Sequence, residues 1–177
     1  MKWARRLRNL LLIGVGVVLV VALAGLPLYV FPVEEPVPTA DVVYVIGPPT
    51  QVRLEKNDEL LARGTAQRSL ISVPSDDSYR SRMLKRECSS AETTCATPDP
   101  FTTIGEARLL TESGAESAVV ITFTPHVART RFIFDKCFDG AVTVVGVEQH
   151  LGVGQWIYQY AYQSAAFIKA FFEPCPS

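Results

Sequence analysis

The feature that most constrains this chain is an uncharged apolar run near its N-terminus. From Leu10 to Val33 the sequence contains no charged side chain over 24 positions. As a helix, such a run would be about 36 Å long, which is enough to cross a bilayer core of about 30 Å. The sequence therefore predicts one transmembrane helix over residues 10–33.

The charges beside this run predict its orientation. Lys2, Arg5, Arg6 and Arg8 precede it, and acidic residues follow it. By the positive-inside rule, residues 1–9 form a basic tail in the cytoplasm and everything beyond the span lies outside it. The alternative is a signal peptide cleaved after Ala24, because Ala22-Leu23-Ala24 resembles a cleavage site. We expect an uncleaved signal anchor in the cell membrane, because the apolar run continues for nine residues beyond Ala24.

The remaining composition is that of a folded, exported domain. From Leu10 onward there are 13 basic and 18 acidic residues, so a clustered basic surface for nucleic acid is not expected. The apolar content of 48% excludes a disordered chain. Residues 34–40 contain two prolines and are interpreted as a short stiff linker, followed by one domain over 41–177.

The four cysteines all lie in this domain and form an even set. Disulfides are therefore predicted, in agreement with export. Three pairings are possible, and proximity in sequence favours Cys88 with Cys95, which leaves Cys137 with Cys175. A metal site is a weak alternative, because the spacing contains no C-x-x-C.

Strands and helices alternate along the domain. Apolar runs that end at turn residues predict strands, and mixed runs that end at glycine or serine predict helices. The stretch 75–100 is polar, with a possible short helix over 79–86. Alternation of this kind predicts an α/β domain with a parallel sheet and helices on both faces. The expected strands are 41–47, 68–73, 117–123 and 142–147, and the expected helices are 51–63, 102–113, 127–138 and 156–172.

Three segments carry a resemblance to a known family. They are DVVYVIGPPTQVRLEKNDELLARGTAQRSLISVP, the stretch TTIGEAR over 102–108, and VVITFTPHVARTRFIF over 119–134. In this order the set resembles the YdcF/SanA/ElyC-like family of bacterial envelope proteins. The resemblance covers about 135 residues. It implies a Rossmann-like fold, membrane anchoring and a role in envelope biogenesis or barrier function, without an agreed reaction.

A ligand site is expected outside the carboxyl ends of the strands. Arg53 is a candidate for binding a phosphate or carboxylate, and an ion pair with Glu55 or Asp58 is the alternative. Glu106 is a candidate general base, or else only the capping-box partner of Thr103. His126 is a candidate for anion binding or proton transfer. Arg129 shares a helix face with His126, whereas Arg131 is expected to be solvated or ion-paired.

Other residues complete the predicted site. Gly47 lies at the first turn, and hydroxyls for an oxyanion come from Thr102, Thr103 and Thr124, although threonine before a helix is often only a cap. His150 lies in a loop that either closes over a ligand or merely connects two elements. The aromatic residues of 156–172 are expected to pack in the core, with a membrane-facing surface as the alternative.

These observations lead to two hypotheses for function. In the first, the domain binds an anionic small molecule or a lipid-linked precursor. In the second, it is a non-enzymatic scaffold or regulator that binds other envelope proteins. No G-x-S-x-G, Walker A or H-E-x-x-H motif is present, and neither a reaction nor a cofactor is assigned.

Overall fold

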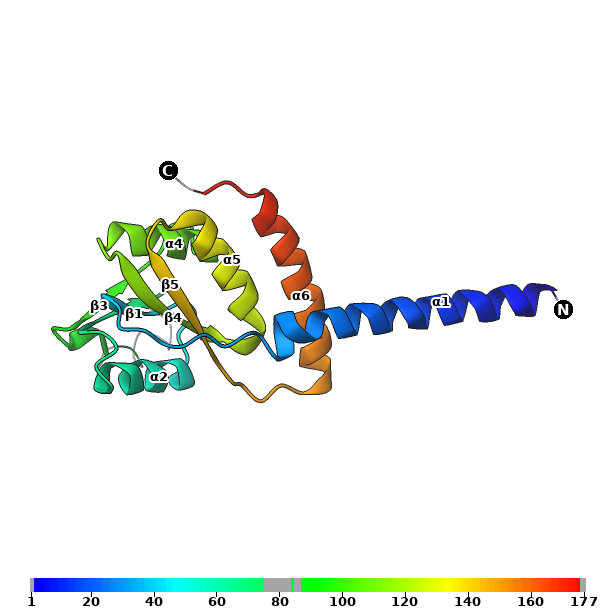
Figure 1. Ribbon diagram of the computed structural model, residues 1–177, viewed down its shortest axis with the longest axis horizontal. Coiled ribbons are helices and arrows are strands. Elements are labelled where there is room, and N and C mark those ends of the chain that lie inside the picture. Colours follow the sequence, from blue (N-terminus) through cyan, green and yellow to red (C-terminus); the bar gives the residue numbers. More distant parts are fainter. Residues whose placement is uncertain (1, 75–83, 85–86, 176–177) are drawn as a thin grey trace.

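The computed structural model describes residues 2–74, 84 and 87–175, and its domain is built on one parallel sheet (Figure 1). The strand order is β3-β2-β1-β4-β5, and every neighbouring pair is parallel. This confirms the predicted α/β, Rossmann-like fold. The strands are β1 (Val42–Val45), β2 (Arg68–Ser72), β3 (Thr93–Ala96), β4 (Ser117–Phe123) and β5 (Ala141–Val147).

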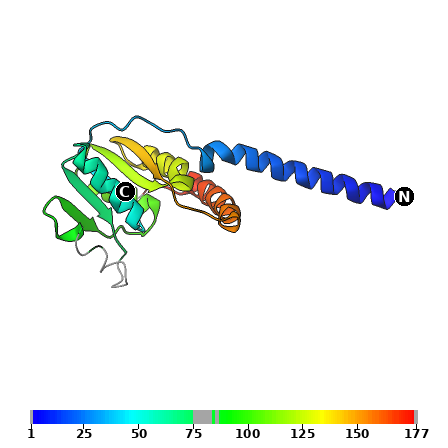
Figure 2. The same cartoon turned by 90° about the horizontal axis from the view of Figure 1, so that it is seen from below.

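Helices cover both faces of this sheet. Helix α2 (Gln51–Ala62) lies on one face, and α4 (Thr103–Glu112) and α5 (Val127–Cys137) lie together on the other (Figures 1 and 2). Alternate residues of β1 point to the two faces, so Val43 packs in the core under α2 while Tyr44 packs in the core under α5. Both side chains are fully buried, as expected for a parallel strand covered on both sides.

One strand, β3, was not predicted. It lies in the stretch 75–100, which was interpreted as polar connection, and it forms one edge of the sheet. Its residue Cys95 forms a disulfide with Cys88, which belongs to the short helix η2 (Glu87–Ser89). The short helix expected over 79–86 lies, apart from Leu84, outside the described residues.

The N-terminal run forms α1 (Lys2–Gly25), which continues into one π-helical segment, η1 (Leu26–Val30). The stretch Arg5–Val30 is long and apolar enough to cross a membrane, and its side chains are almost all exposed. The basic tail belongs to the same helix as the apolar run, and Tyr29, within the predicted span, is buried against the domain.

Residues 34–40 form neither helix nor strand, in agreement with a linker. They are held to the domain at both ends. Arg131 of α5 forms an ion pair with Glu35 at 3.1 Å and donates to the carbonyl of Val33, and the Ala40 amide donates to Thr65. The prediction that Arg131 is ion-paired is confirmed.

The last helix, α6 (Val153–Phe172), departs from its predicted role as a core helix. Only Gln163 and Ala170 are buried among its residues. The expected core packing of its aromatic residues is therefore wrong for Tyr158 and Phe171, which are 60% and 64% exposed. The other side of α6 does pack, because Phe167 lies against Phe132 of α5 with ring centroids 5.1 Å apart.

The chain after α6 is fixed to α5. Cys175 forms a disulfide with Cys137 at the end of α5, which is the predicted pairing. The ammonium of Lys136 donates to the carbonyls of Ala170 and Glu173 at 3.0 and 2.6 Å. These contacts hold the C-terminal end of α6 against the domain.

We expect the two disulfides to contribute unequally to stability. Replacing Cys137 and Cys175 by serine opens the longer loop and should lower the free energy of unfolding by about 4 kcal/mol, against about 2.5 kcal/mol for Cys88 and Cys95. Urea unfolding of the full chain in detergent micelles, followed by circular dichroism, measures both values. A larger loss from the Cys88 and Cys95 pair would contradict the expectation.

Candidate functional site

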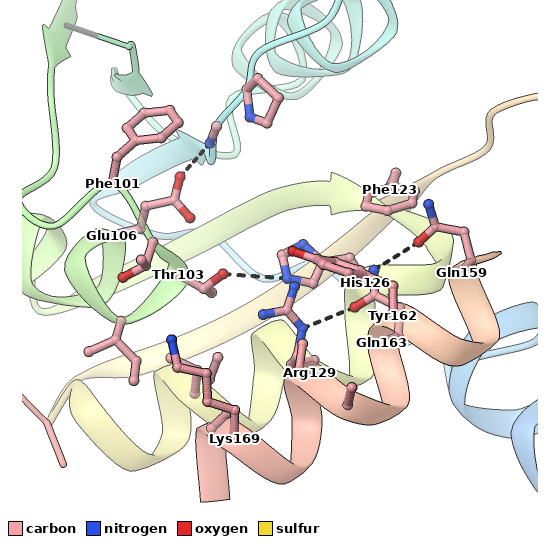
Figure 3. A pocket seen from close by; sticks show the side chains of 18 of the residues that line it. Phe101, Thr103, Glu106, Phe123, His126, Arg129, Gln159, Tyr162, Gln163 and Lys169 are labelled. Carbon is pink, nitrogen blue, oxygen red and sulfur yellow. Dashed lines mark hydrogen bonds between the residues drawn. The ribbon is translucent and has the colours of Figure 1, made fainter. Parts of the chain in front are cut away.

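The site lies where the strand order reverses. Strand β1 pairs with β2 on one side and with β4 on the other, so the chain leaves β1 and β4 in opposite directions. The segments that follow these two strands leave a crevice at the carboxyl edge of the sheet. A cavity of about 720 Å³ lies there, and α6 forms one of its walls (Figure 3). Seven predicted site residues line it: Gly47, Arg53, Thr102, Thr103, Glu106, His126 and Arg129.

Glu106 projects from the first turns of α4 towards the end of β1. Its Oε1 accepts a hydrogen bond of 2.5 Å from the Gly47 amide. The capping-box interpretation is wrong, because Thr102 is the N-cap and its hydroxyl accepts from the Gly105 amide. Glu106 therefore lies one residue beyond the position from which a capping-box side chain reaches the N-cap amide. Its carboxyl group is free of that role and faces the cavity.

The surroundings of Glu106 raise its pKa to about 7. Burial is the main cause, because the side chain is only 4% exposed and the ionised form loses its hydration. The Gly47 hydrogen bond, the Ser72 hydroxyl and the two guanidinium groups oppose this increase. A carboxyl group with a pKa near 7 can give or take a proton at neutral pH.

Gly47 permits the close approach of this carboxyl group. A Cβ atom at position 47 would lie 2.9 Å from Phe101 and from the Ser72 hydroxyl, and 3.2 Å from Oε1 of Glu106. Any larger residue would displace these groups. Gly47 thus affects Glu106 in two ways. Its amide donates a hydrogen bond to the carboxyl group, and its lack of a side chain leaves room for that group.

His126 is held between two threonine hydroxyls. Its Nδ1 shares a hydrogen bond of 2.9 Å with Thr122, and its Nε2 lies 3.5 Å from the Thr103 hydroxyl. Burial, and then the charges of Arg129 and Arg53, lower its pKa well below the ordinary value. His126 is therefore neutral, so in anion binding it would act through a hydrogen bond and not through charge. As a neutral imidazole it can donate or accept one hydrogen bond in the cavity.

Two guanidinium groups supply the positive charge of the cavity. Arg53 is 4% exposed, donates from Nη1 to the carbonyls of Ile46 and Pro48, and lies over the ring of Phe123. Arg129 donates from Nε to Oε1 of Gln163 at 3.0 Å and lies over the ring of Tyr162. Gln163 and Tyr162 are uncharged, so they orient the Arg129 guanidinium group without neutralising it.

Helix α6 contributes residues that the sequence did not indicate. Gln163 is fully buried, orients Arg129 through Oε1, and donates from Nε2 to Gln159. Thr122, which orients His126, was also missed because it lies inside a strand. The available signal for α6 was a pair of glutamines four residues apart, Gln159 and Gln163, within an aromatic helix. Lys169, further along the helix, also lines the cavity.

Two predicted residues lie elsewhere. The Thr124 hydroxyl donates to the Val147 carbonyl at 3.2 Å, so it ties the start of α5 to β5 and does not line the cavity. His150 is exposed in the loop before α6 and is also absent from the cavity wall. Among the described residues, no group of three His, Cys, Asp or Glu side chains is placed to hold a metal ion.

No family model, curated protein or solved structure matches this chain. The site therefore has to be interpreted from its own geometry. That geometry combines two oriented guanidinium groups, a neutral imidazole and a carboxyl group with a raised pKa around one cavity.

The raised pKa of Glu106 should make the protein less stable as the pH rises. The folded carboxyl holds its proton more tightly than the unfolded one, whose pKa is 4.5. Its stabilising contribution is complete below pH 4.5 and is lost as the pH approaches 7. Between pH 5 and pH 8 we expect this carboxyl group to account for a loss of about 2.5 kcal/mol in the free energy of unfolding, whereas His126, whose folded pKa is lowered, acts in the opposite direction.

Urea unfolding of the full chain at the two pH values tests this. Glu106→Gln is the matched control, because its amide oxygen can still accept from Gly47 while the titration is removed. From pH 5 to pH 8, wild type should lose about 2.5 kcal/mol of unfolding free energy relative to the change measured in the variant, because the contribution of His126 is common to both proteins. An equal pH dependence in both proteins would contradict the raised pKa.

His126 should remain uncharged where an ordinary histidine is protonated. The chain has two histidines, so His150→Gln leaves His126 alone. Nitrogen-15 NMR of this variant should show a neutral ring at pH 5.5, below the ordinary pKa of 6.5. Unfolding the same sample in urea should restore protonation, and a charged ring in the folded protein would refute the assignment.

Proposed function

We propose that this protein is anchored in the cell membrane by α1 and binds an anionic small molecule or a lipid-linked precursor in the crevice of an extracytoplasmic domain. In this proposal residues 1–9 lie in the cytoplasm. The length and composition of α1 support the anchor, and the two disulfides support an oxidising compartment outside the cytoplasm. The process that it serves is cell-envelope biogenesis or barrier maintenance.

The observation that carries the proposal is the pairing of Arg53 and Arg129 in one cavity. Burying a cation costs free energy, and the cost is offset when an anion binds beside it. Burial lowers the pKa of Arg129, which is a direct sign of this cost. Among the described residues, Arg129 forms no ion pair with a carboxylate, so a bound anion would be its charged partner.

The helix ends support the same ligand. Thr102, Thr103 and Ile104 open α4 and line the cavity. The N-terminus of a helix carries partial positive charge and amide groups that point outward, which favours a bound phosphate or carboxylate. His126, at the start of α5, adds a neutral hydrogen-bonding group on the other side.

Glu106 gives the site a possible proton donor or acceptor. Oε1 is engaged by Gly47, so Oε2 is the atom that would carry the proton. With a pKa of about 7, Glu106 can protonate or deprotonate a group of the bound anion. The proposal is one of binding, and any proton transfer would start from this residue.

The arrangement of the family-like segments agrees with this proposal. The stretch 102–108 contributes Thr103 and Glu106, and the stretch 119–134 contributes His126 and Arg129, all to one cavity wall. Residues that resemble the YdcF/SanA/ElyC-like family thus come together around the ligand space. A ligand-binding domain accounts for this convergence, whereas a scaffold gives it no role.

We expect Arg129→Gln to weaken anion binding without unfolding the domain. Loss of one charge-assisted hydrogen bond costs about 1.5–3 kcal/mol, which corresponds to a roughly 10- to 100-fold weaker affinity. Calorimetry with the full chain in nanodiscs, using inorganic phosphate, sugar nucleotides and polyprenyl phosphates, measures it.

Arg131→Gln is the matched control, because it removes a guanidinium group from the same helix outside the cavity. It should leave the affinity unchanged. Equal affinities in wild type and Arg129→Gln, or an equal loss in both variants, would contradict the proposed site.

A further inference from the structure

One large apolar surface takes no part in the site described above. It runs along the outer side of α6 and consists of Val153, Ile157, Ile168 and Phe172, which are 64–80% exposed. These residues recur at helical spacing, so they form one stripe. Lys169 is the sole charged residue within α6. A stripe of this kind on a soluble domain would be in contact with water at considerable cost.

The position of α6 relative to α1 indicates what covers this stripe. Tyr160 of α6 donates through its hydroxyl to the carbonyl of Ala22 in α1, at 3.2 Å. Its ring fills the space beside Gly25, where a Cβ atom would overlap it. Tyr29 in η1 also contacts α6, with its ring 5.1 Å from that of Tyr160 and its hydroxyl 2.9 Å from Ser164.

These contacts set the depth of α6 in a membrane. Twenty residues counted from Leu10 span about 30 Å and end at Tyr29, so Ala22 would lie about 10 Å inside the hydrocarbon. The Tyr160 hydroxyl that reaches Ala22 would then lie within the outer hydrocarbon, while Ser164 of α6 lies beside Tyr29 at the end of the span, so the axis of α6 would lie at the boundary between hydrocarbon and headgroups. Interfacial helices bury their apolar face about 5–10 Å into this layer.

The direction of α6 fits this depth. Its axis runs across that of α1, on the side of the domain that faces the anchor (Figures 1 and 2). A membrane spanned by α1 would lie parallel to α6. Trp156 and Tyr160 are residues of the kind that accumulate at membrane interfaces.

The opposite side of α6 forms a wall of the cavity, so one helix separates the ligand space from the membrane surface. A helix with its side chains is about 10–12 Å across. The cavity has the Arg53 guanidinium at the end of β1, the Arg129 guanidinium against Gln163 of α6, and apolar lining from Ile133, Tyr158, Ala166 and Ala170. Its 720 Å³ would hold much more than a phosphate ion. The shape and polarity fit an anionic headgroup attached to an apolar chain.

We propose that α6 lies in the headgroup layer of the membrane that α1 spans, and that the cavity takes the phosphate of a lipid from this layer. The inference rests on the proposed anchor and anion site, and it names the membrane as the source of the ligand.

Fluorescence quenching tests the position of α6. In the full chain, Trp3→Phe and Trp156→Phe remove both tryptophans, and single tryptophans are then introduced by Val18→Trp, Ile168→Trp or Arg63→Trp. Arg63 is exposed at the end of α2, beside the amino ends of the strands and away from α6. In nanodiscs of phosphatidylcholine brominated near the headgroup, Ile168→Trp should lose most of its emission and Arg63→Trp should keep it.

The α1 variant separates the two proposals. If Val18→Trp is quenched by deeply brominated lipid while Ile168→Trp is not quenched by any lipid, the inference about α6 is overturned and the anchor stands. If Val18→Trp is not quenched either, the anchor itself fails. Quenching of Ile168→Trp together with Val18→Trp supports the inference.

A second experiment tests the source of the phosphate. Ile157→Asp with Ile168→Asp places charge on the stripe without touching the cavity wall. Inorganic phosphate should bind this variant as it binds wild type. Binding of phosphatidic acid presented in phosphatidylcholine nanodiscs should fall at least severalfold. If the double variant binds phosphatidic acid as wild type does, or loses affinity equally for both probes, the lipid source is overturned. Arg129→Gln is then measured with the same two probes. If it binds both of them more weakly than wild type, the anion site stands even where the lipid source fails.

Discussion

The complete burial of β1 is the constraint on which the rest of this structure depends. Val43, Tyr44 and Val45 have no exposed surface, so helices must cover both faces of the sheet. The chain can then add strands only beside β1, first β2 and β3 on one side and later β4 and β5 on the other. This change in the direction of strand addition opens a crevice at the end of β1. Gly47 is the first residue after β1 that no longer pairs with β2 or β4. The site is thus a consequence of how the core is covered.

Most of this fold could be predicted from the sequence because buried parallel strands are continuous apolar runs. Strand β3 escaped prediction because it lies at an edge, where Thr93 and Thr94 face partly outward, and its pairing with β2 is long-range. The site was predicted in part for a similar reason. Strand ends and helix starts are visible in the sequence, so Arg53, Glu106, His126 and Arg129 could be named. Which of them are charged depends on burial, which no local pattern reveals.

The charges in the cavity are mutually dependent. His126 is neutral because two guanidinium groups and burial oppose a third positive charge. Those guanidinium groups also help to keep the pKa of Glu106 near 7, where burial alone would raise it further. Removing one of them would therefore alter the protonation of the carboxyl group as well as the binding of an anion. Gln163 takes part in this balance without carrying charge, because it fixes where the Arg129 charge lies.

The position of α6 in the chain has a consequence for the timing of ligand binding. This helix follows all five strands, yet it supplies one wall of the cavity and the amide that orients Arg129. During synthesis, the sheet and its crevice can assemble while α6 is still within the ribosome. A nascent chain in that state would have a shallow, open groove in place of a cavity. The order of the elements thus delays completion of the cavity until α6 has been synthesised and has packed against the rest of the domain.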